Sequence, residues 1–327
     1  MINVFFSTAI LLQYFFIPFF IMTQLSVLFL GTGGSWPTQK RNVTSIAIRR
    51  GSEVILFDCG EGTQRQFQKS RLSYMQISKI FITHFHGDHF LGLPGLFQTM
   101  QLNDRDKPLY VFGPKGIVEL VGQLLNLGYF KPTYDIIAQE IDQKDKLDFG
   151  DYFVEIIRVK HGVPALAYSM EEKVRPGKFN KKKALDLGIP EGPLFSKIQR
   201  GQSVTLKNGD IIGSDMVLGS PRRGRKIVFS GDTVPFEKMI VFSKNADVLI
   251  HDATFVSELE DIANEYGHST AFQAAGIAKK ANVDCLYLTH ISPRYLDCNI
   301  VLGDAKKVFK KSFVPKDFDE FEVKLKG

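Results

Sequence analysis

The 327-residue chain is 44% hydrophobic, so it can bury one large core or two smaller ones. Its formal net charge of +6 and pI near 9.0 suit an acidic partner such as RNA, although charge alone does not demand one. The three cysteines, Cys59, Cys285 and Cys298, are odd in number and lack CxxC spacing, which argues against a disulfide framework and a zinc ribbon. We therefore expect a cytoplasmic protein.

The first stretch of the chain, MINVFFSTAILLQYFFIPFFIM, is apolar almost throughout. As a membrane-spanning helix it is borderline, because about 20 apolar residues are needed and Gln13 and Pro18 interrupt it. It also lacks the positively charged start and the small-residue cleavage site of a signal peptide. We expect residues 1–21 to be an extension outside the working protein, which would begin at Met22. A membrane anchor over residues 4–22 and an ordered element are the alternatives.

From Leu25 onward, short β-like runs alternate with helical patterns and glycine turns. Several runs are nearly continuous in apolar residues, as expected for strands covered on both faces. The predicted strands are 26–31, 45–48, 54–60, 77–84, 152–160, 226–231, 246–252 and 284–290. The predicted helices are 62–69, 89–101, 115–127, 268–281 and 303–311. This alternation favours a layered α/β fold, and no long repeat or low-complexity linker divides the chain.

One segment, residues 171–207, breaks this alternation. It is rich in Lys, Arg, Gly and Pro and poor in sustained apolar periodicity. Taken alone, such a composition favours a solvated loop that protrudes from the core.

Residue types that bind metal ions are concentrated in FITHFHGDHFLGLPGL, residues 81–96. His84 and His86 are two apart on chain leaving a predicted strand, so both side chains can point to one side. Asp88 and His89 follow at the expected start of a helix, and they are too close in sequence to occupy one position of a single metal ion. Neutral imidazoles and carboxylates are ligands of Zn²⁺ and similar cations, so the pattern predicts two adjacent metal ions. The alternative interpretation needs no metal: Asp88 would cap the N-terminus of the helix, and the histidines would be polar residues at the edge of the fold.

Three more candidate ligands each follow a later predicted strand. They are His161 in VKHGVPAL, Asp232 in FSGDTVPF and His290 in LYLTHISPRY. The carboxyl ends of strands are where the loops of an α/β sheet assemble their sites. We therefore expect these side chains to join the cluster at 84–89.

The order HxHxDH, His, GDT and a late His resembles that of the metallo-β-lactamase superfamily. Within it, five stretches resemble the ribonuclease Z family in its short form: GTGGSWPT (31–38), FDCGEGTQRQ (57–66), HDATF (251–255), HST (268–270) and THISPRY (289–295). The resemblance runs from about Leu25 to near the C-terminus. It implies a four-layer αβ/βα sandwich over residues 22–327, with the metals at one edge of two sheets.

The resemblance also implies two zinc ions per subunit, with Mn²⁺ or Fe²⁺ as alternatives. The ligands of the first ion would be His84, His86 and His161. The ligands of the second would be Asp88, His89 and His290, and Asp232 would bridge the two.

The resemblance implies that the chain cleaves phosphodiester bonds. This reaction needs a proton for the departing oxygen, besides the metal ions. His268 is our candidate acid, because it is a histidine outside the ligand set at the start of a predicted helix. Asp252 could orient it from the other ring nitrogen, and Asp88 could orient the attacking water as well as ligate. Many similar family members carry Glu where this chain has Asp252, whose side chain is one methylene shorter. His251 alternates with Asp252 on a strand, so we expect it to point away and to be structural.

The resemblance gives residues 171–207 the role of the family's flexible arm, which holds tRNA away from the catalytic site. Basic side chains would then meet backbone phosphates: Arg175, Lys178, Lys181, Lys182 and Lys183. The Gly-Pro tip would include Gly192 and Pro193. Nearer the metals, the candidate substrate contacts are Thr233, Ser292 and Arg294.

The sequence thus predicts a zinc-dependent endoribonuclease that removes the 3′ trailer from precursor tRNA, leaving a 3′-hydroxyl on the tRNA and a 5′-phosphate on the trailer. We expect a homodimer, as the family implies, that does not act on DNA. Two alternatives stay open: a phosphodiesterase of the same superfamily acting on a smaller substrate, and an RNA-binding homologue with an inactive site.

Overall fold

The computed structural model describes residues 23–326, so the predictions for residues 1–22 lie outside the described part. Within these residues no helix is long and apolar enough to cross a membrane. The described chain forms two compact units. The smaller comprises residues 149–151 and 175–221, and the larger comprises the rest.

The first sheet of the larger unit has seven strands in the order β16-β1-β2-β3-β4-β5-β6. Its members are β1 (Leu25–Gly31), β2 (Ser45–Arg50), β3 (Glu53–Phe57), β4 (Ile77–Phe81), β5 (Leu109–Gly113), β6 (Ile136–Glu140) and β16 (Glu320–Glu322). Strands β3 to β6 are parallel, and the other pairs are antiparallel. Its outer face packs against α1 (Thr63–Lys69), α3 (Leu93–Leu102) and α4 (Ile117–Leu125), which bury Phe67, Phe97 and Val121 in one core.

The second sheet also has seven strands, in the order β15-β14-β13-β12-β9-β8-β7. These are β7 (Lys146–Asp148), β8 (Tyr152–Arg158), β9 (Leu166–Glu172), β12 (Lys226–Phe229), β13 (Val248–Asp252), β14 (Cys285–Thr289) and β15 (Ser312–Phe313). Its outer helices are α7 (Glu237–Phe242), α9 (Ala271–Lys280) and α10 (Asn299–Lys306). The α8 helix (Glu260–Glu265) and the single turns η1 (Tyr74–Gln76) and η3 (Ser257–Leu259) complete this unit, with α2 (Gly87–Phe90) beside the site.

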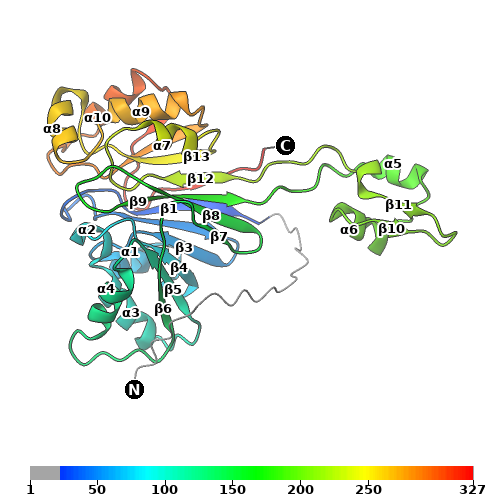
Figure 1. The fold of residues 1–327 in the computed structure, drawn as a ribbon, viewed down its shortest axis with the longest axis horizontal. Coiled ribbons are helices and arrows are strands. Elements are labelled where there is room, and N and C mark those ends of the chain that lie inside the picture. The colour runs from blue at the N-terminus through cyan, green and yellow to red at the C-terminus, as the bar shows by residue number, and fades with distance from the viewer. Residues whose placement is uncertain (1–22, 327) are drawn as a thin grey trace. The chain divides into compact units, whose positions relative to one another are not determined.

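Aromatic side chains join the two sheets. Phe57 of β3 stacks on Phe229 of β12, with ring centroids 5.7 Å apart, and on Tyr168 of β9 at 5.6 Å. Helices cover both outer faces of the paired sheets (Figure 1). The expected four-layer αβ/βα sandwich is therefore confirmed.

Most predicted elements are present with shifted ends. The helix expected over 89–101 is divided into α2 and α3 around Leu91 and Gly92, where Gly92 packs against the backbone of Gly60. The helix expected over 303–311 begins earlier, at Asn299, whose backbone N–H donates to the carboxylate of Asp297. It ends at Lys306.

The smaller unit has a core of its own. It contains α5 (Lys181–Asp186), α6 (Pro193–Gln199), a two-stranded ribbon of β10 (Val204–Thr205) and β11 (Ile211–Ile212), and the turn η2 (Ser214–Met216). Apolar side chains spread over some thirty positions pack together: Ala184, Ile189, Phe195, Ile198, Val204, Ile212 and Val217. Segment 171–207 is thus more ordered than its composition suggests. Its bounds also differ, since Glu171 and Glu172 belong to β9 and the unit continues to Pro221.

Candidate metal centre and active site

Three histidines converge at the ends of β4 and β8. The Nδ1 atom of His86 lies 3.1 Å from Nε2 of His84 and 3.2 Å from Nε2 of His161. Two nitrogens bound to one tetrahedral zinc ion at 2.0–2.1 Å would be about 3.3 Å apart. The three imidazoles are therefore spaced as ligands of one metal ion.

A second group forms where α2 meets the segment after β14. Oδ2 of Asp88 lies 3.1 Å from Nε2 of His290 and 3.6 Å from Nε2 of His89. These three residues form another set that could hold a metal ion. His290 adopts a left-handed backbone with φ 59°, which is uncommon for a non-glycine residue and turns its ring into the cluster.

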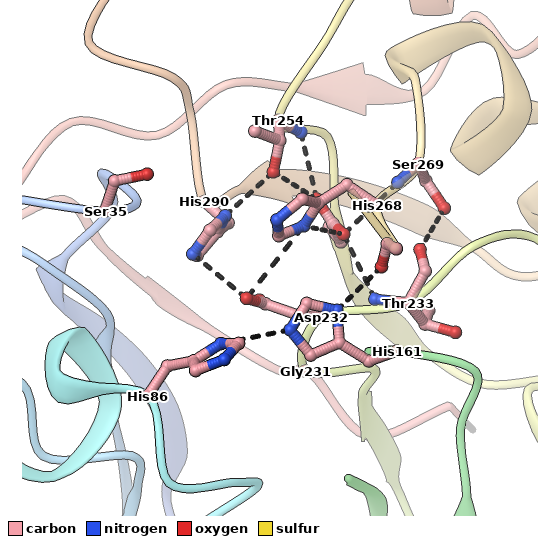
Figure 2. A network of polar contacts seen from close by, with 12 residues as sticks. Ser35, His86, His161, Gly231, Asp232, Thr233, Thr254, His268, Ser269 and His290 are labelled. Atoms are coloured by element: carbon pink, nitrogen blue, oxygen red, sulfur yellow. Dashed lines mark hydrogen bonds and ion pairs between the residues drawn. The ribbon is translucent and has the colours of Figure 1, made fainter. Parts of the chain in front are cut away.

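Asp232 lies between the two groups, just after β12. Its Oδ2 atom is 3.7 Å from Nε2 of His84, 3.2 Å from Nε2 of His89 and 3.1 Å from Nε2 of His290. One carboxylate oxygen thus faces both sets of ligands, as a bridging ligand would. Figure 2 shows its contact with His290.

The ring nitrogens on the far side of the ligand histidines are held by hydrogen bonds. His161 Nδ1 donates to the carbonyl of Gly267 at 2.9 Å, and His290 Nδ1 lies 2.8 Å from the Thr254 hydroxyl. His84 Nδ1 lies 3.0 Å from the Thr83 hydroxyl. Such contacts fix the tautomer and leave the opposite nitrogen for a metal.

Asp58, which the sequence analysis left without a role, orients His89. Its carboxylate lies 2.7 Å from Nδ1 of His89 and accepts from both the N–H and the hydroxyl of Thr83. The opposite nitrogen of His89, Nε2, is buried and makes no hydrogen bond of good geometry among the described residues, although Oδ2 of Asp232 lies 3.2 Å away. A buried ring nitrogen left in this state fits a metal ligand. The signal in the sequence was the position of Asp58 directly after a buried strand.

The electrostatics of the cluster favour a cation. Burial opposes charge on His89, but the carboxylates of Asp232 and Asp58 outweigh it and raise the pKa of His89 well above its usual value. Burial and the neighbouring His89 lower the pKa of His84 well below its usual value, so that ring stays neutral. Burial alone would raise the pKa of Asp88, yet the hydrogen bond from His290 and the charge of His89 lower it. The surrounding carboxylates thus stabilise positive charge at this place, which the proton on His89 supplies here. A bound metal ion would take over that charge and displace the proton, since imidazoles bind metals in their neutral form and carboxylates in their ionised form.

His268 and Asp252 form a pair beside these ligands. Nδ1 of His268 lies 2.9 Å from Oδ2 of Asp252, whose other oxygen accepts from the N–H and the hydroxyl of Thr254. Burial opposes a charge on His268, but Asp252 outweighs it and raises the pKa of His268 to about 9. The ring is therefore protonated at neutral pH. His251 is buried and bonds through Nδ1 to the carbonyl of Asp252, away from the cluster.

The candidate substrate contacts near the metals differ in accessibility. Thr233 is fully buried, and its hydroxyl donates to the carbonyl of Val234, so the structure does not present this side chain to a substrate. Ser292 is also largely buried and accepts from Nε of Arg294. The guanidinium of Arg294 lies over the ring of Phe255 at 4.8 Å.

Sequence reasoning missed a contact from the glycine-rich turn after β1. The backbone N–H of Ser35 donates to Oδ2 of Asp88 at 2.7 Å. The preceding Gly34 lies against His290, and a Cβ at this glycine would come within 2.4 Å of Cε1 of that ring. The turn GTGGS therefore closes one side of the candidate metal centre.

The candidate contacts of the smaller unit are exposed within that unit. Lys178, Lys181 and Lys183 line an open cavity of about 450 Å³ together with the backbone of Gly219. Lys181 also pairs with Glu191, 2.8 Å away. Lys182, Gly192 and Pro193 are exposed, and Pro193 is the first residue of α6, whereas Arg175 is half-buried.

The sandwich and its paired ligand sets define a metal-binding hydrolase of the metallo-β-lactamase fold. Residues 197–291 match the family described as beta-lactamase superfamily domain, and residues 25–173 match the family described as anti-Pycsar protein Apyc1. The solved structure of human tRNase Z, short form, is similar with a TM-score of 0.68 and 28% identity, over 92% of this chain and 100% of that one.

Two archaeal relatives extend this likeness to nearly the full sequence. Ribonuclease Z of Methanosarcina acetivorans is 46% identical over 301 residues, which are 92% of this chain and 98% of the relative. Ribonuclease Z of Pyrococcus horikoshii is 46% identical over 304 residues, with 93% and 98% covered. The chain therefore belongs to the ribonuclease Z family, a family of endoribonucleases.

Proposed function

We propose that this chain removes the 3′ trailer from precursor tRNA by hydrolysing one phosphodiester bond, leaving a 3′-hydroxyl on the tRNA and a 5′-phosphate on the trailer. The observation that carries the proposal is Asp232, whose single carboxylate oxygen faces both ligand sets beside the His268–Asp252 pair. Full-length relatives named ribonuclease Z support the substrate class.

The donors suit two zinc ions per subunit. Imidazoles and carboxylates are the ligand types that hold Zn²⁺ in hydrolases, and Mn²⁺ or Fe²⁺ could use the same set. One ion would be held by His84, His86 and His161, the other by Asp88, His89 and His290, with Asp232 shared. When bound, two zinc ions lower the pKa of a water and neutralise charge on the phosphoryl oxygens.

The protein groups divide the proton transfers between them. Asp88 has one oxygen fixed by Ser35 and His290, and its Oδ1 is left to orient the attacking water. His268 has Nδ1 fixed by Asp252, so Nε2 carries the proton that the departing 3′ oxygen takes up. Asp252 keeps the imidazolium charged until that transfer, because it raises the pKa of the ring.

The smaller unit would bind tRNA through its phosphates. Its exposed lysines would bind phosphates whatever the nucleotide sequence, and this binding would weaken as the salt concentration rises. Such binding suits a substrate that is recognised by its shape. We also propose that the protein acts on RNA and not DNA, and that it works as a homodimer, as its family implies. The free thiols of Cys59, Cys285 and Cys298 fit the reducing cytosol.

The test is cleavage of a 3′-extended precursor tRNA by protein that starts at Met22, beside a His86→Ala variant. We expect cleavage at the tRNA 3′ end that is blocked by a chelator, restored by zinc, and lost in the variant. Mass spectrometry of both products identifies the 3′-hydroxyl and the 5′-phosphate. Metal-loaded protein that binds the precursor without cutting it would refute the proposed activity and favour the RNA-binding alternative.

A further inference from the structure

The loop from Ser35 to Lys40 presents the only tryptophan of the chain at the edge of the candidate metal centre. The Trp36 side chain is 61% exposed, and among residues 23–326 no aromatic ring or cation lies over its indole. Single exposed apolar residues are common on proteins, so exposure alone decides nothing. The position and the rigidity of this loop distinguish it.

The position of Trp36 is set by its neighbours. The backbone N–H of Ser35 bonds to Oδ2 of Asp88, which also contacts His290. Figure 2 shows Ser35 beside His290. Because consecutive Cα atoms are about 3.8 Å apart, the indole begins one residue from a group that contacts a candidate metal ligand.

The loop is also held rigidly. Its start pairs with the segment after β14, through bonds between Gly34 and Ile291 at 3.2 Å and between Ile291 and Thr32 at 3.0 Å. Its end is closed by the N–H of Thr38, which donates to the carbonyl of Arg41 at 2.8 Å. Because the backbone is held, a ligand that stacks on the indole has to order only the Trp36 side chain, and an aromatic side chain with two rotatable bonds loses little conformational entropy.

We propose that Trp36 is a stacking platform for an unpaired nucleobase next to the cleaved phosphodiester, an inference that rests on the proposed function. Aromatic rings beside cationic groups are how proteins hold single-stranded nucleic acid, and stacking accepts any base. The exposed Lys40 of the same loop supplies the charge. A trailer of any sequence has such a base, so this contact explains how the enzyme could hold its cut site without reading a sequence.

The sole tryptophan makes the contact measurable in the unmodified protein. The probe is a precursor tRNA with one non-hydrolysable phosphonate link at the cut, added to zinc-loaded enzyme while tryptophan emission is recorded. We expect the tryptophan emission to fall as RNA is added, and to level off at the RNA concentration that saturates binding. The loss of emission should disappear when an abasic residue replaces one of the two nucleotides at the link. Unchanged emission at saturating RNA would overturn the proposal.

Kinetics provide the second measurement. Trp36→Ala should raise KM for precursor about tenfold, and Trp36→Phe should recover most of the loss, since a smaller ring still stacks. The matched control is Tyr129→Ala, which removes a fully exposed aromatic side chain of the larger unit and should keep the wild-type KM. Equal KM in the wild type and Trp36→Ala, with normal cleavage by both, rejects the stacking role alone. Absence of cleavage by the wild type rejects the proposed function itself.

Discussion

Nδ1 of His268 lies 2.9 Å from Oδ2 of Asp252, although this side chain is one methylene shorter than the glutamate that the family resemblance leads us to expect here. The shorter side chain reaches because Asp252 is the last residue of β13 and its carboxylate is held from several sides. Thr254 donates to Oδ1, and the N–H groups of Thr233 and Ser269 donate to Oδ2. The pair is therefore fixed by the surrounding backbone.

If His268 is the general acid, its removal should depend on the leaving group. His268→Ala should lower kcat on precursor tRNA by about 10²–10⁴-fold, because the 3′ oxygen departs without a proton. A p-nitrophenyl phosphodiester, whose leaving group needs no proton at neutral pH, should be affected far less. The measurement is kcat on both substrates, with bound metal measured in both proteins. Equal losses on the two substrates at equal metal content would remove His268 from this role.

Asp252 should set the alkaline limit of activity. It raises the pKa of His268 to about 9, so the acid form is present below that pH and is lost as the pH rises through it. In Asp252→Asn the charge is gone, and the pKa of His268 should fall towards its usual value. The alkaline limb of the kcat profile should then move to lower pH. A profile that keeps its limb and only loses amplitude would contradict this coupling.

Thr254 links Asp252 to the candidate ligand His290. Its hydroxyl donates to Asp252 and lies 2.8 Å from Nδ1 of His290, so it can accept that ring proton. Thr254→Val keeps the shape and removes the hydroxyl, which should weaken binding of one metal ion about 10–100-fold. Competition with a chelator measures the change, and Thr254→Ser is the control that retains the hydroxyl. Identical affinities for Val and Ser would show that the link does not position His290.

The cluster of candidate metal ligands was predictable because its members sit in one short motif or directly after a strand. The residues that hold these ligands by hydrogen bonds were not predictable. Asp58, Thr83 and Thr254 act across the sheet through contacts that connect β3, β4 and the segment after β13, and nothing local in the sequence pairs them. Thr233 was expected to contact the substrate, but the fold buries its side chain.

Elements at the edges of the sheets were also missed. The edge strand β6 is only partly buried, so it lacks the continuous apolar run that marked the central strands. In the smaller unit the core residues come from two short helices, a ribbon and a turn, and no window of the sequence contains enough of them to show a period.

Neutralising the lysines of the smaller unit should separate tRNA binding from catalysis. Lys178, Lys181 and Lys183 changed together to Gln should raise KM for precursor on the order of tenfold at physiological salt and flatten its salt dependence. The matched control changes the exposed Lys244, Lys279 and Lys280 of the larger unit. Measuring KM against salt concentration for both triple variants tests the proposal. Equal effects of the two triples would mean that general charge, and not this unit, attracts the RNA.

A nearly buried ion pair outside the site predicts an acid-sensitive fold. Glu172 of β9 receives two hydrogen bonds from the guanidinium of Arg225, and both side chains are nearly buried. Burial alone would raise the pKa of Glu172, but Arg225 and Arg50 outweigh it and lower it. A depressed pKa contributes stability above the unfolded value near 4.5, and that stability is lost as the pH falls through the folded pKa.

Glu172→Gln should therefore destabilise the protein by about 3 kcal/mol at pH 7, because Arg225 is left buried without its counter-charge. The deficit should shrink as the pH is lowered below 4.5, where the wild type loses the same charge. Urea unfolding at several pH values measures it, with Glu171→Gln as the control, since that carboxylate is more exposed and lies 4.0 Å from Lys226. A deficit that stays constant down to low pH would show that the charge of Glu172 is not what Arg225 requires.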